Sequence, residues 1–293
     1  MPDAGAMRAQ SRAQERTDIK QAGKRQVADK PMIEVSNLTK TFPARNGAPA
    51  VLALDNVDVA QKDGEFLAVM GPSGCGKTTL LNIVAGFETP ESGTCKVADR
   101  IVTRAGPDRG VVFQEYGLFP WMTVERNIVF AMKAAKQWDR DGLKRAHDIL
   151  SRMGLINFTK AFPKNLSGGM RQRVAIARIL AINSPVMLMD EPFGALDALT
   201  RHVLQRELID LWTETRKTIL FITHSSEEAV YLADRVLVMT ARPGRIVLDM
   251  PIELERPRDP TEARFNAYKR RILDVINPSL TEAATKPELR SVS

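Results

Sequence analysis

The sequence has little cysteine and no long apolar run. Only two of its 293 residues are cysteines, Cys75 and Cys95, and their spacing fits neither a zinc site nor a redox pair. So few thiols indicate a reducing cytosol rather than a secreted disulfide framework. No apolar run approaches the roughly 18 residues that a membrane-spanning helix needs, so we expect any membrane association to come through a partner.

Most of the chain also lacks a strong excess of positive or negative charge. The formal net charge is +7, and the first 30 residues hold seven Lys/Arg against four Asp/Glu with almost no large apolar side chains. This composition predicts a disordered basic arm over 1–30, and it lacks the apolar core of a secretory signal. The remaining charge is compatible with a nucleic acid, a membrane surface or an anionic ligand.

The body of the chain alternates strand and helix patterns. Residues 33–69 indicate strands separated by turns, and residues 114–185 carry apolar side chains at helical spacing. Continuous apolar runs predict strands that are covered on both faces, as in a parallel sheet. We therefore expect an α/β fold with an inserted helical part and an amphipathic helix over 262–276 before a polar tail. The apolar runs lie at 110–114, 186–190, 218–223 and 235–240.

The stretch GPSGCGKTT follows the apolar run FLAVM and opens a helical pattern. It fits G-x-x-x-x-G-K-[ST], in which glycines let several backbone N–H groups face one anion and the helix start adds a favourable dipole. We expect Lys77 at the β/γ-phosphates and Thr78 on Mg²⁺. Cys75 is either a small filler or a thiol acidified by the helix start, in which case alkylation should slow ATP turnover. The ATP-binding residues predicted here are Gly71, Pro72, Ser73, Gly74, Cys75, Gly76, Lys77, Thr78 and Thr79.

Polar residues stand at the ends of three other predicted strands. VMLMDEP ends in Asp190 and Glu191, which alternation along a strand would point to opposite faces. We expect Asp190 to hold Mg²⁺ and Glu191 to orient or deprotonate the attacking water. Gln114 is predicted to ligate Mg²⁺ or the water, and His224 to contact the terminal phosphate. Solvated strand ends and a structural histidine are the alternatives.

A second anion-binding helix start appears in NLSGGMRQRV. Ser167, Gly168 and Gly169 offer bare N–H groups and a hydroxyl, and the helix behind them carries arginines at 171, 173 and 178. One molecule has little use for two such elements. Two copies arranged head to tail would each close this segment on the ATP held by the other. An ordinary glycine-containing helix start is the alternative.

Taken together, residues 33–265 resemble the ATP-binding subunits of ABC transporters. The resemblance rests on GPSGCGKTT, Gln114, LSGGMRQR, VMLMDEP, GALD (194–197) and His224 in that order. It implies a P-loop NTPase core with a mainly parallel sheet, an antiparallel β subdomain and an inserted α-helical subdomain. It also implies a head-to-tail homodimer, adenine stacking on Phe42, and communication by Asp197 across that dimer. One departure is Ser225, since relatives usually have Asp after the histidine.

The resemblance also implies domain limits and a second partner. It assigns the ABC ATP-binding domain to 31–265, its helical subdomain to about 115–183, and the C-terminal helix and tail to 266–293. The segment EYGLFPWMTVERNI, 115–128, is rich in large apolar residues, which either fill the helical core or form a groove for a partner helix. We expect a membrane permease to dock there.

Further motifs narrow the expected class. LFPWMTV, EEAVYLADRV, ARPGRI and ERPRDP look like ATPases of nitrate, sulfonate and taurine importers. This implies uptake of a small anion with a periplasmic solute-binding protein, and a peripheral position on the cytoplasmic face of the inner membrane. The alternative is a soluble ABC-type ATPase that acts on nucleic acid or ribosomes, although we expect no nucleic acid. The sequence does not identify the solute.

Overall fold

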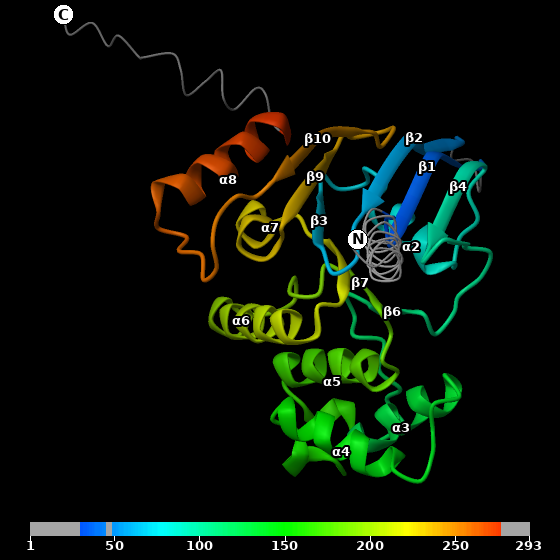
Figure 1. Ribbon diagram of the computed structural model, residues 1–293, viewed down its shortest axis with the longest axis vertical. Coiled ribbons are helices and arrows are strands. Elements are labelled where there is room, and N and C mark those ends of the chain that lie inside the picture. Colours follow the sequence, from blue (N-terminus) through cyan, green and yellow to red (C-terminus); the bar gives the residue numbers. More distant parts are fainter. Residues whose placement is uncertain (1–29, 45–48, 277–293) are drawn as a thin grey trace, which may run out of the picture.

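The computed structural model describes residues 30–44 and 49–276, and it contains two sheets (Figure 1). The predicted arm over 1–30 and the predicted tail beyond 276 lie almost wholly outside the described residues. No helix in the described ranges is long and apolar enough to cross a membrane. The larger sheet has six strands, in the order β10-β9-β3-β8-β7-β6. They are β3 (Phe66–Met70), β6 (Arg109–Val112), β7 (Val186–Asp190), β8 (Thr218–Ile222), β9 (Arg235–Met239) and β10 (Ile246–Pro251).

The larger sheet is parallel except for its edge strand β10, which runs antiparallel to β9. Strands β3, β7, β8 and β9 are almost completely buried, as their continuous apolar runs predict. Two strands end earlier than the sequence indicates, since β6 stops at Val112 and β8 at Ile222. Gln114 and His224 therefore lie on the loops after these strands.

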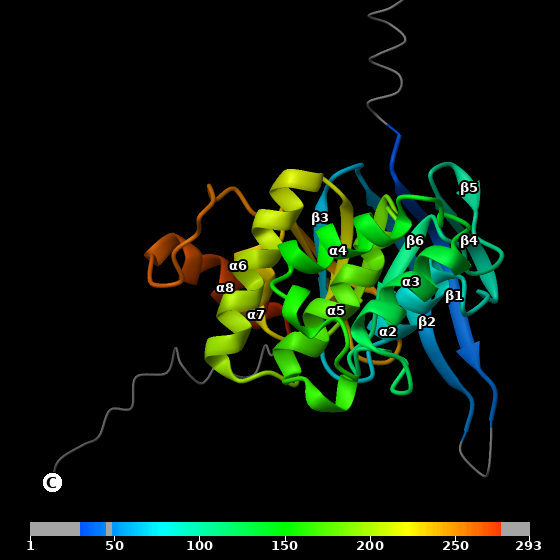
Figure 2. The same ribbon diagram turned by 90° about the horizontal axis from the view of Figure 1, so that it is seen from below.

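The smaller sheet is antiparallel and has the order β2-β1-β4-β5. Its strands are β1 (Ile33–Phe42), β2 (Val51–Gln61), β4 (Ser92–Val97) and β5 (Arg100–Ile101). A buried apolar cluster from β1, β2, β3 and helix α2 (Lys77–Ala85) fills the space between the two sheets. Figures 1 and 2 show this sheet on one side of the molecule and α6 (Ala198–Thr215), α7 (Ser226–Leu232) and α8 (Ala263–Ile276) on the other.

The inserted helices gather at one end of the molecule (Figure 1). They are α3 (Val124–Ala134), α4 (Gly142–Arg152) and α5 (Gly168–Ala181), with short 3-10 turns at Ile156–Phe158 and Pro163–Asn165. They bury a cluster of their own that includes Ile128, Leu150 and Val174. The opposite face of α5 packs on the core of the larger sheet. This helix therefore joins the helical part to the sheet.

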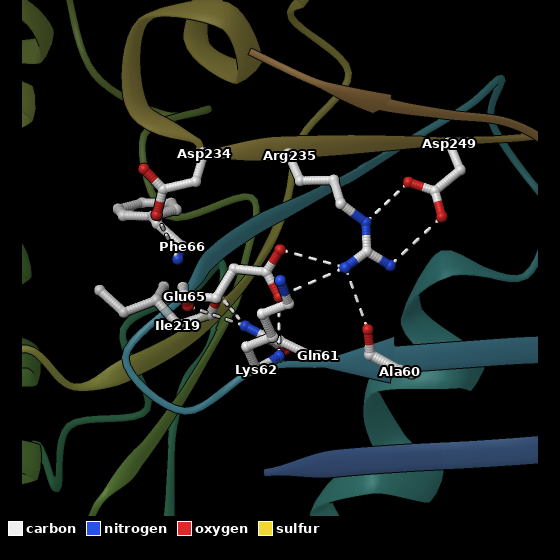
Figure 3. Close-up of polar contacts among 9 residues, drawn as sticks. All are labelled: Ala60, Gln61, Lys62, Glu65, Phe66, Ile219, Asp234, Arg235 and Asp249. Atoms are coloured by element: carbon white, nitrogen blue, oxygen red, sulfur yellow. Dashed lines mark hydrogen bonds and ion pairs between the residues drawn. The ribbon is translucent and has the colours of Figure 1, made fainter. Parts of the chain in front are cut away.

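One arginine ties the two sheets together at the amino ends of β3 and β9 (Figure 3). Arg235 donates to Asp249 on β10 at 2.6 Å and to Glu65 just before β3 at 3.1 Å. It also donates to the backbone oxygen of Ala60 on β2 at 3.0 Å. Its side chain is 19% exposed, so these contacts are partly shielded from solvent. The opposite, carboxyl ends of the strands remain available for a site.

Candidate active site

The predicted phosphate loop joins β3 to α2 in a left-handed turn. Gly76 is the N-cap of α2 with φ 93°, and no side chain caps this helix start. A side chain at residue 76 would meet Ala53 of β2, since a Cβ there would lie 2.6 Å from its carbonyl oxygen. Glycine is therefore required both for the backbone angle and for the close approach. The first N–H groups of α2 are left to bind an anion.

The lysine of this loop is folded over its backbone. Lys77 is 6% exposed, and its Nζ donates to the backbone oxygens of Gly71 at 2.8 Å and Pro72 at 3.1 Å. It also lies 3.8 Å from Sγ of Cys75. Cys75 is completely buried beneath the loop, which favours its role as a filler over that of an accessible thiol. The ammonium is thus held against the loop by two of its backbone carbonyl oxygens.

The carboxyl end of β7 brings an acid to the start of α2. Oγ1 of Thr78 donates to Oδ1 of Asp190 at 3.3 Å. Burial raises the pKa of the Asp190 carboxyl, and the neighbouring Glu191 adds to this, whereas the Thr78 hydrogen bond and Lys77 oppose it. A cation beside this carboxylate would favour its charged form.

This pair is compatible with Mg²⁺. The described residues contain no cluster of three or more His, Cys, Asp or Glu side chains that could hold a metal. Mg²⁺ does not require one, because it is typically bound through one or two carboxylates, with phosphate and water oxygens completing its shell. A hydroxyl and a carboxylate oxygen at the mouth of a phosphate loop therefore fit this ion.

The second acid points to the predicted histidine. Oε2 of Glu191 lies 3.0 Å from Nδ1 of His224, whose side chain is 65% exposed. Glu191 follows the end of β7 with φ 43°, so a turn rather than strand alternation separates it from Asp190. A Cβ at Gly194 would lie within 4.0 Å of both the Glu191 carboxylate and the Gln114 amide. The end of β7 and the loops after β6 and β8 thus bring Gln114, Asp190, Glu191 and His224 to one edge of the sheet.

The segment Ser167–Gly169 starts α5 and faces other parts of the chain. Ser167 is an exposed N-cap whose Oγ accepts from the backbone N–H of Met170 at 3.3 Å. Its two glycines lie against Leu196, Thr200 and Tyr116, none of which belongs to the phosphate loop. The prediction that this segment closes on ATP therefore concerns a second molecule, which this structure does not contain.

Asp197 and Phe42 occupy local structural positions as well. Asp197 is the N-cap of α6, where its Oδ1 accepts from the backbone N–H of Thr200 at 2.9 Å. Hydrogen bonds from the backbone and the side chain of Thr200 lower the pKa of the Asp197 carboxyl. Phe42 ends β1, is half-buried, and has Nζ of Lys40 at 5.3 Å from its ring centroid. Its strand pairs with β2, which contacts the phosphate loop through Ala53. Adenine stacking on Phe42 stays a prediction.

Two residues at the site were not singled out from the sequence. Tyr116 has φ 64°, and its ring carries the Arg171 guanidinium at 5.3 Å. It thereby joins the Gln114 loop to the start of α5. Arg242 lies beside the phosphate loop, with its guanidinium 3.2 Å from where a Cβ at Gly74 would be. Neither has a local sequence signal, because each contact depends on how distant loops are brought together.

Sequence comparison agrees with this geometry. The family model described as ABC transporter matches residues 54–194. An uncharacterised ABC transporter ATP-binding protein from Methanocaldococcus jannaschii, MJ0412, is 48% identical over 254 residues, which cover 87% of this chain and 94% of that protein. The chain belongs to the ABC transporter ATP-binding family. The nitrate import ATP-binding protein NrtD from Synechocystis is 46% identical over 237 residues, 81% of this chain and 88% of NrtD.

Solved structures of the ABC family share the fold. The ATP-binding cassette MJ0796, solved as a dimer in a post-hydrolysis state with ADP and Pi, matches with a TM-score of 0.67. It is 32% identical to this chain and covers 76% of it and 100% of its own length. The chain described here is therefore an ATP-hydrolysing transport ATPase with the predicted P-loop core. The alternative of an ATPase acting on nucleic acid or ribosomes gains no support.

Proposed function

We propose that this protein is the ATPase subunit of an importer for a small anion such as nitrate, sulfonate or taurine. The similarity to NrtD supports the solute class. In this proposal residues 31–265 form the ATP-binding domain, with a helical subdomain at about 115–183. The protein acts as a head-to-tail homodimer on the cytoplasmic face of the inner membrane. A periplasmic binding protein delivers the solute to the permease.

The observations that carry the catalytic proposal are the Thr78–Asp190 and Glu191–His224 contacts at one sheet edge. Lys77 binds the β/γ-phosphates, and Thr78 and Asp190 hold Mg²⁺. When bound, this ion supplies positive charge against the phosphate oxygens. Glu191 orients the attacking water and accepts its proton, because its carboxylate lies free of the metal pair and 3.0 Å from the histidine.

His224 and Gln114 complete this set of roles. His224 holds the Glu191 carboxylate and contacts the terminal phosphate, for which its exposed ring is accessible. Gln114, on the loop after β6, ligates Mg²⁺ or the water. Ser167, Gly168 and Gly169 of the second molecule close the site over ATP with backbone N–H groups and a hydroxyl. Hydrolysis then weakens the contacts between the two molecules.

A hollow beside the Gln114 loop supports permease docking. A cavity of about 270 Å³ lies between the end of α2, β6, α3 and α5. Four aromatic rings line it, and three of them are exposed: Phe87 at 50%, Phe113 at 38% and Phe130 at 43%. Phe119, within the predicted segment 115–128, is the fourth. An exposed aromatic hollow of this kind fits the apolar face of a short partner helix. Its nearness to Gln114 would link docking to ATP.

The catalytic and dimer proposals are tested with Glu191→Gln. This variant should still bind ATP, lose turnover and elute as a dimer with ATP and Mg²⁺ in size-exclusion chromatography. Glu214→Gln, at an exposed acid on α6, is the matched control and should behave like the wild type. A Glu191→Gln protein that stays monomeric at saturating ATP and Mg²⁺ would contradict the shared site. Lys77→Ala should instead weaken ATP binding by at least about tenfold.

The docking proposal is tested by co-expression with a candidate permease subunit of an ABC importer. Phe130→Ser should abolish co-purification with that permease and leave the ATPase rate of the free subunit unchanged. Leu273→Ser is the control, because Leu273 is exposed to a similar extent, 49%, on the distant helix α8. Equal retention of the permease by both variants would argue against this surface. Uptake assays with the assembled transporter would then identify the solute.

A further inference from the structure

A buried acid lies directly behind His224. Glu228 on α7 is 7% exposed, and the Thr223 hydroxyl donates to its Oε2 at 2.5 Å. Its other oxygen, Oε1, accepts from Nε2 of Gln205 at 3.2 Å and lies 3.8 Å from Nε of Arg201. Gln205 and Arg201 are both on α6. A carboxylate in such surroundings is held by these partners and does not rotate freely.

The Thr223 hydroxyl controls the backbone on both sides of His224. It has one proton, which it donates to Glu228, so its lone pairs are available to accept. One of them accepts from the backbone N–H of Ser225 at 3.0 Å. The Ser225 hydroxyl in turn accepts from the backbone N–H of Glu228 at 3.3 Å and caps α7. The hydrogen bond from Ser225 N–H to the Thr223 hydroxyl therefore fixes the turn that contains His224. Serine at 225 also provides the helix cap that an aspartate there would provide.

On the α6 side, this network reaches Leu196 and Asp197, the last two residues of the GALD motif (194–197). The Arg201 guanidinium donates to the backbone oxygen of Leu196 at 2.9 Å while it faces Glu228. Leu196 lies against Gly168, at the start of α5, and precedes the N-cap Asp197. A single side chain thus contacts the Leu196–Asp197 segment on one side and the acid behind His224 on the other.

We infer that Thr223, Glu228 and Arg201 are positioning residues that hold His224 against Glu191 and connect it to the Leu196–Asp197 segment. The inference rests on the role proposed above for His224, and none of the three belongs to the residues proposed to contact ATP. They fix the turn that sets where the imidazole lies. A movement of Leu196 and Asp197 would pass through Arg201 and Glu228 to the histidine.

Paired threonine variants test this inference. Thr223→Val removes the hydroxyl from a residue that is 1% exposed, and Thr218→Val does the same for a residue of 0% exposure at the other end of β8. Thr218 also has two hydrogen bonds to lose, from the Gly64 N–H and to Asp63. Both variants should lower thermal stability. Only Thr223→Val should lower kcat, by about tenfold or more with KM for ATP within about twofold, because a misplaced catalytic group slows the chemical step.

The second readout does not depend on activity. The chain has only three histidines, so ¹³C-labelled histidine gives a simple NMR spectrum in which His224→Ala assigns one signal. Thr223→Val should shift the His224 signal and leave that of His147 in place. Thr223→Ser restores the hydroxyl and should return both the signal and kcat toward wild-type values.

The link through α6 is tested by Arg201→Met, with Arg206→Met on the exposed part of the same helix as control. Arg201→Met should lower kcat at least threefold, as expected for a displaced catalytic group, and shift the His224 signal. Arg206→Met should do neither. The inference is overturned if Thr223→Val lowers kcat no more than Thr218→Val, or if the His224 signal stays unmoved in the Thr223 and Arg201 variants.

Discussion

The structure predicts that one substitution at Gln172 increases the stability of the protein. This residue of the LSGGMRQR motif is 0% exposed, and neither its amide nitrogen nor its amide oxygen has a hydrogen-bond partner in the described part of the chain. A buried amide without partners carries a desolvation cost that no interaction returns. Gln172→Met keeps the length and volume of the side chain and removes both polar atoms. The variant should therefore be more stable than the wild type.

The magnitude follows from the two unpaired groups. Each buried unsatisfied group costs about 1–3 kcal/mol, and part of this is recovered by small adjustments in the native protein. We expect Gln172→Met to raise the free energy of unfolding by about 1–2 kcal/mol. For a chain of this size that corresponds to roughly 2–8 °C in Tm.

Gln61 is the matched control, since it is also a glutamine of 0% exposure. Its amide nitrogen donates to the backbone oxygens of Glu65 at 2.9 Å and Ile219 at 2.8 Å. Gln61→Met would remove both of these hydrogen bonds, whereas the Glu65 oxygen would keep the backbone N–H of Ile219 at 3.0 Å and the unpaired Oε1 of Gln61 would also be removed. Because the two lost hydrogen bonds outweigh the removal of one unpaired oxygen, the variant should lower the stability by about 1 kcal/mol. Urea unfolding followed by tryptophan fluorescence measures both variants. A loss of stability in Gln172→Met similar to that in Gln61→Met would refute the reasoning and indicate a bound water on Gln172.

Three further outcomes are expected. Burial raises the pKa of the Cys95 thiol from 9.0 to about 12. The unfolded thiol then ionises first, so the native state loses stability between these pH values, and Cys95→Ala should flatten that part of the curve in urea unfolding at increasing pH. Gly110→Ala should cost about 1–3 kcal/mol because its Cβ would overlap Ile179 on α5, and Ile179→Val should restore part of this loss in thermal unfolding. Asp197→Ala should cost about 1 kcal/mol through loss of the α6 cap, whereas Asp197→Asn should not, and equal losses would argue against capping.

The sequence predicted those parts of the fold whose signal is local. The phosphate loop lies between β3 and α2 as expected, because its glycines are required by backbone angles that few residues adopt. Buried strands such as β7 and β8 are also where their apolar runs indicate. The helix predicted over 262–276 is confirmed as α8, with its start one residue later.

Other elements lack such a signal. The strand β4 was not predicted, since its residues SGTCKV are exposed over the first half and carry no apolar alternation. The edge strand β10 is similarly half-exposed. Both are strands because a neighbouring strand supplies hydrogen-bond partners, which the residues themselves do not reveal.

The site shows the same division. Asp190 lies beside Thr78 and Glu191 lies beside His224, because strand ends of a parallel sheet share one edge. The contacts of Tyr116, Arg242 and Glu228 were not foreseen, since they link segments that are distant in the sequence. Closure of residues 167–169 on ATP would involve contacts between two molecules, which local sequence patterns do not encode.

The fit between the phosphate loop and its neighbours has a consequence for protein engineering. A Cβ at Gly244 would overlap the backbone of Cys75, and a Cβ at Gly76 would overlap the backbone of Ala53. Two segments that are distant in the sequence therefore constrain the conformation of the phosphate loop. A graft of residues 71–79 onto another strand–helix unit would transfer the sequence of the motif without the contacts that hold its backbone conformation. Transferring the function would also require the turn around residue 244 and the middle of β2.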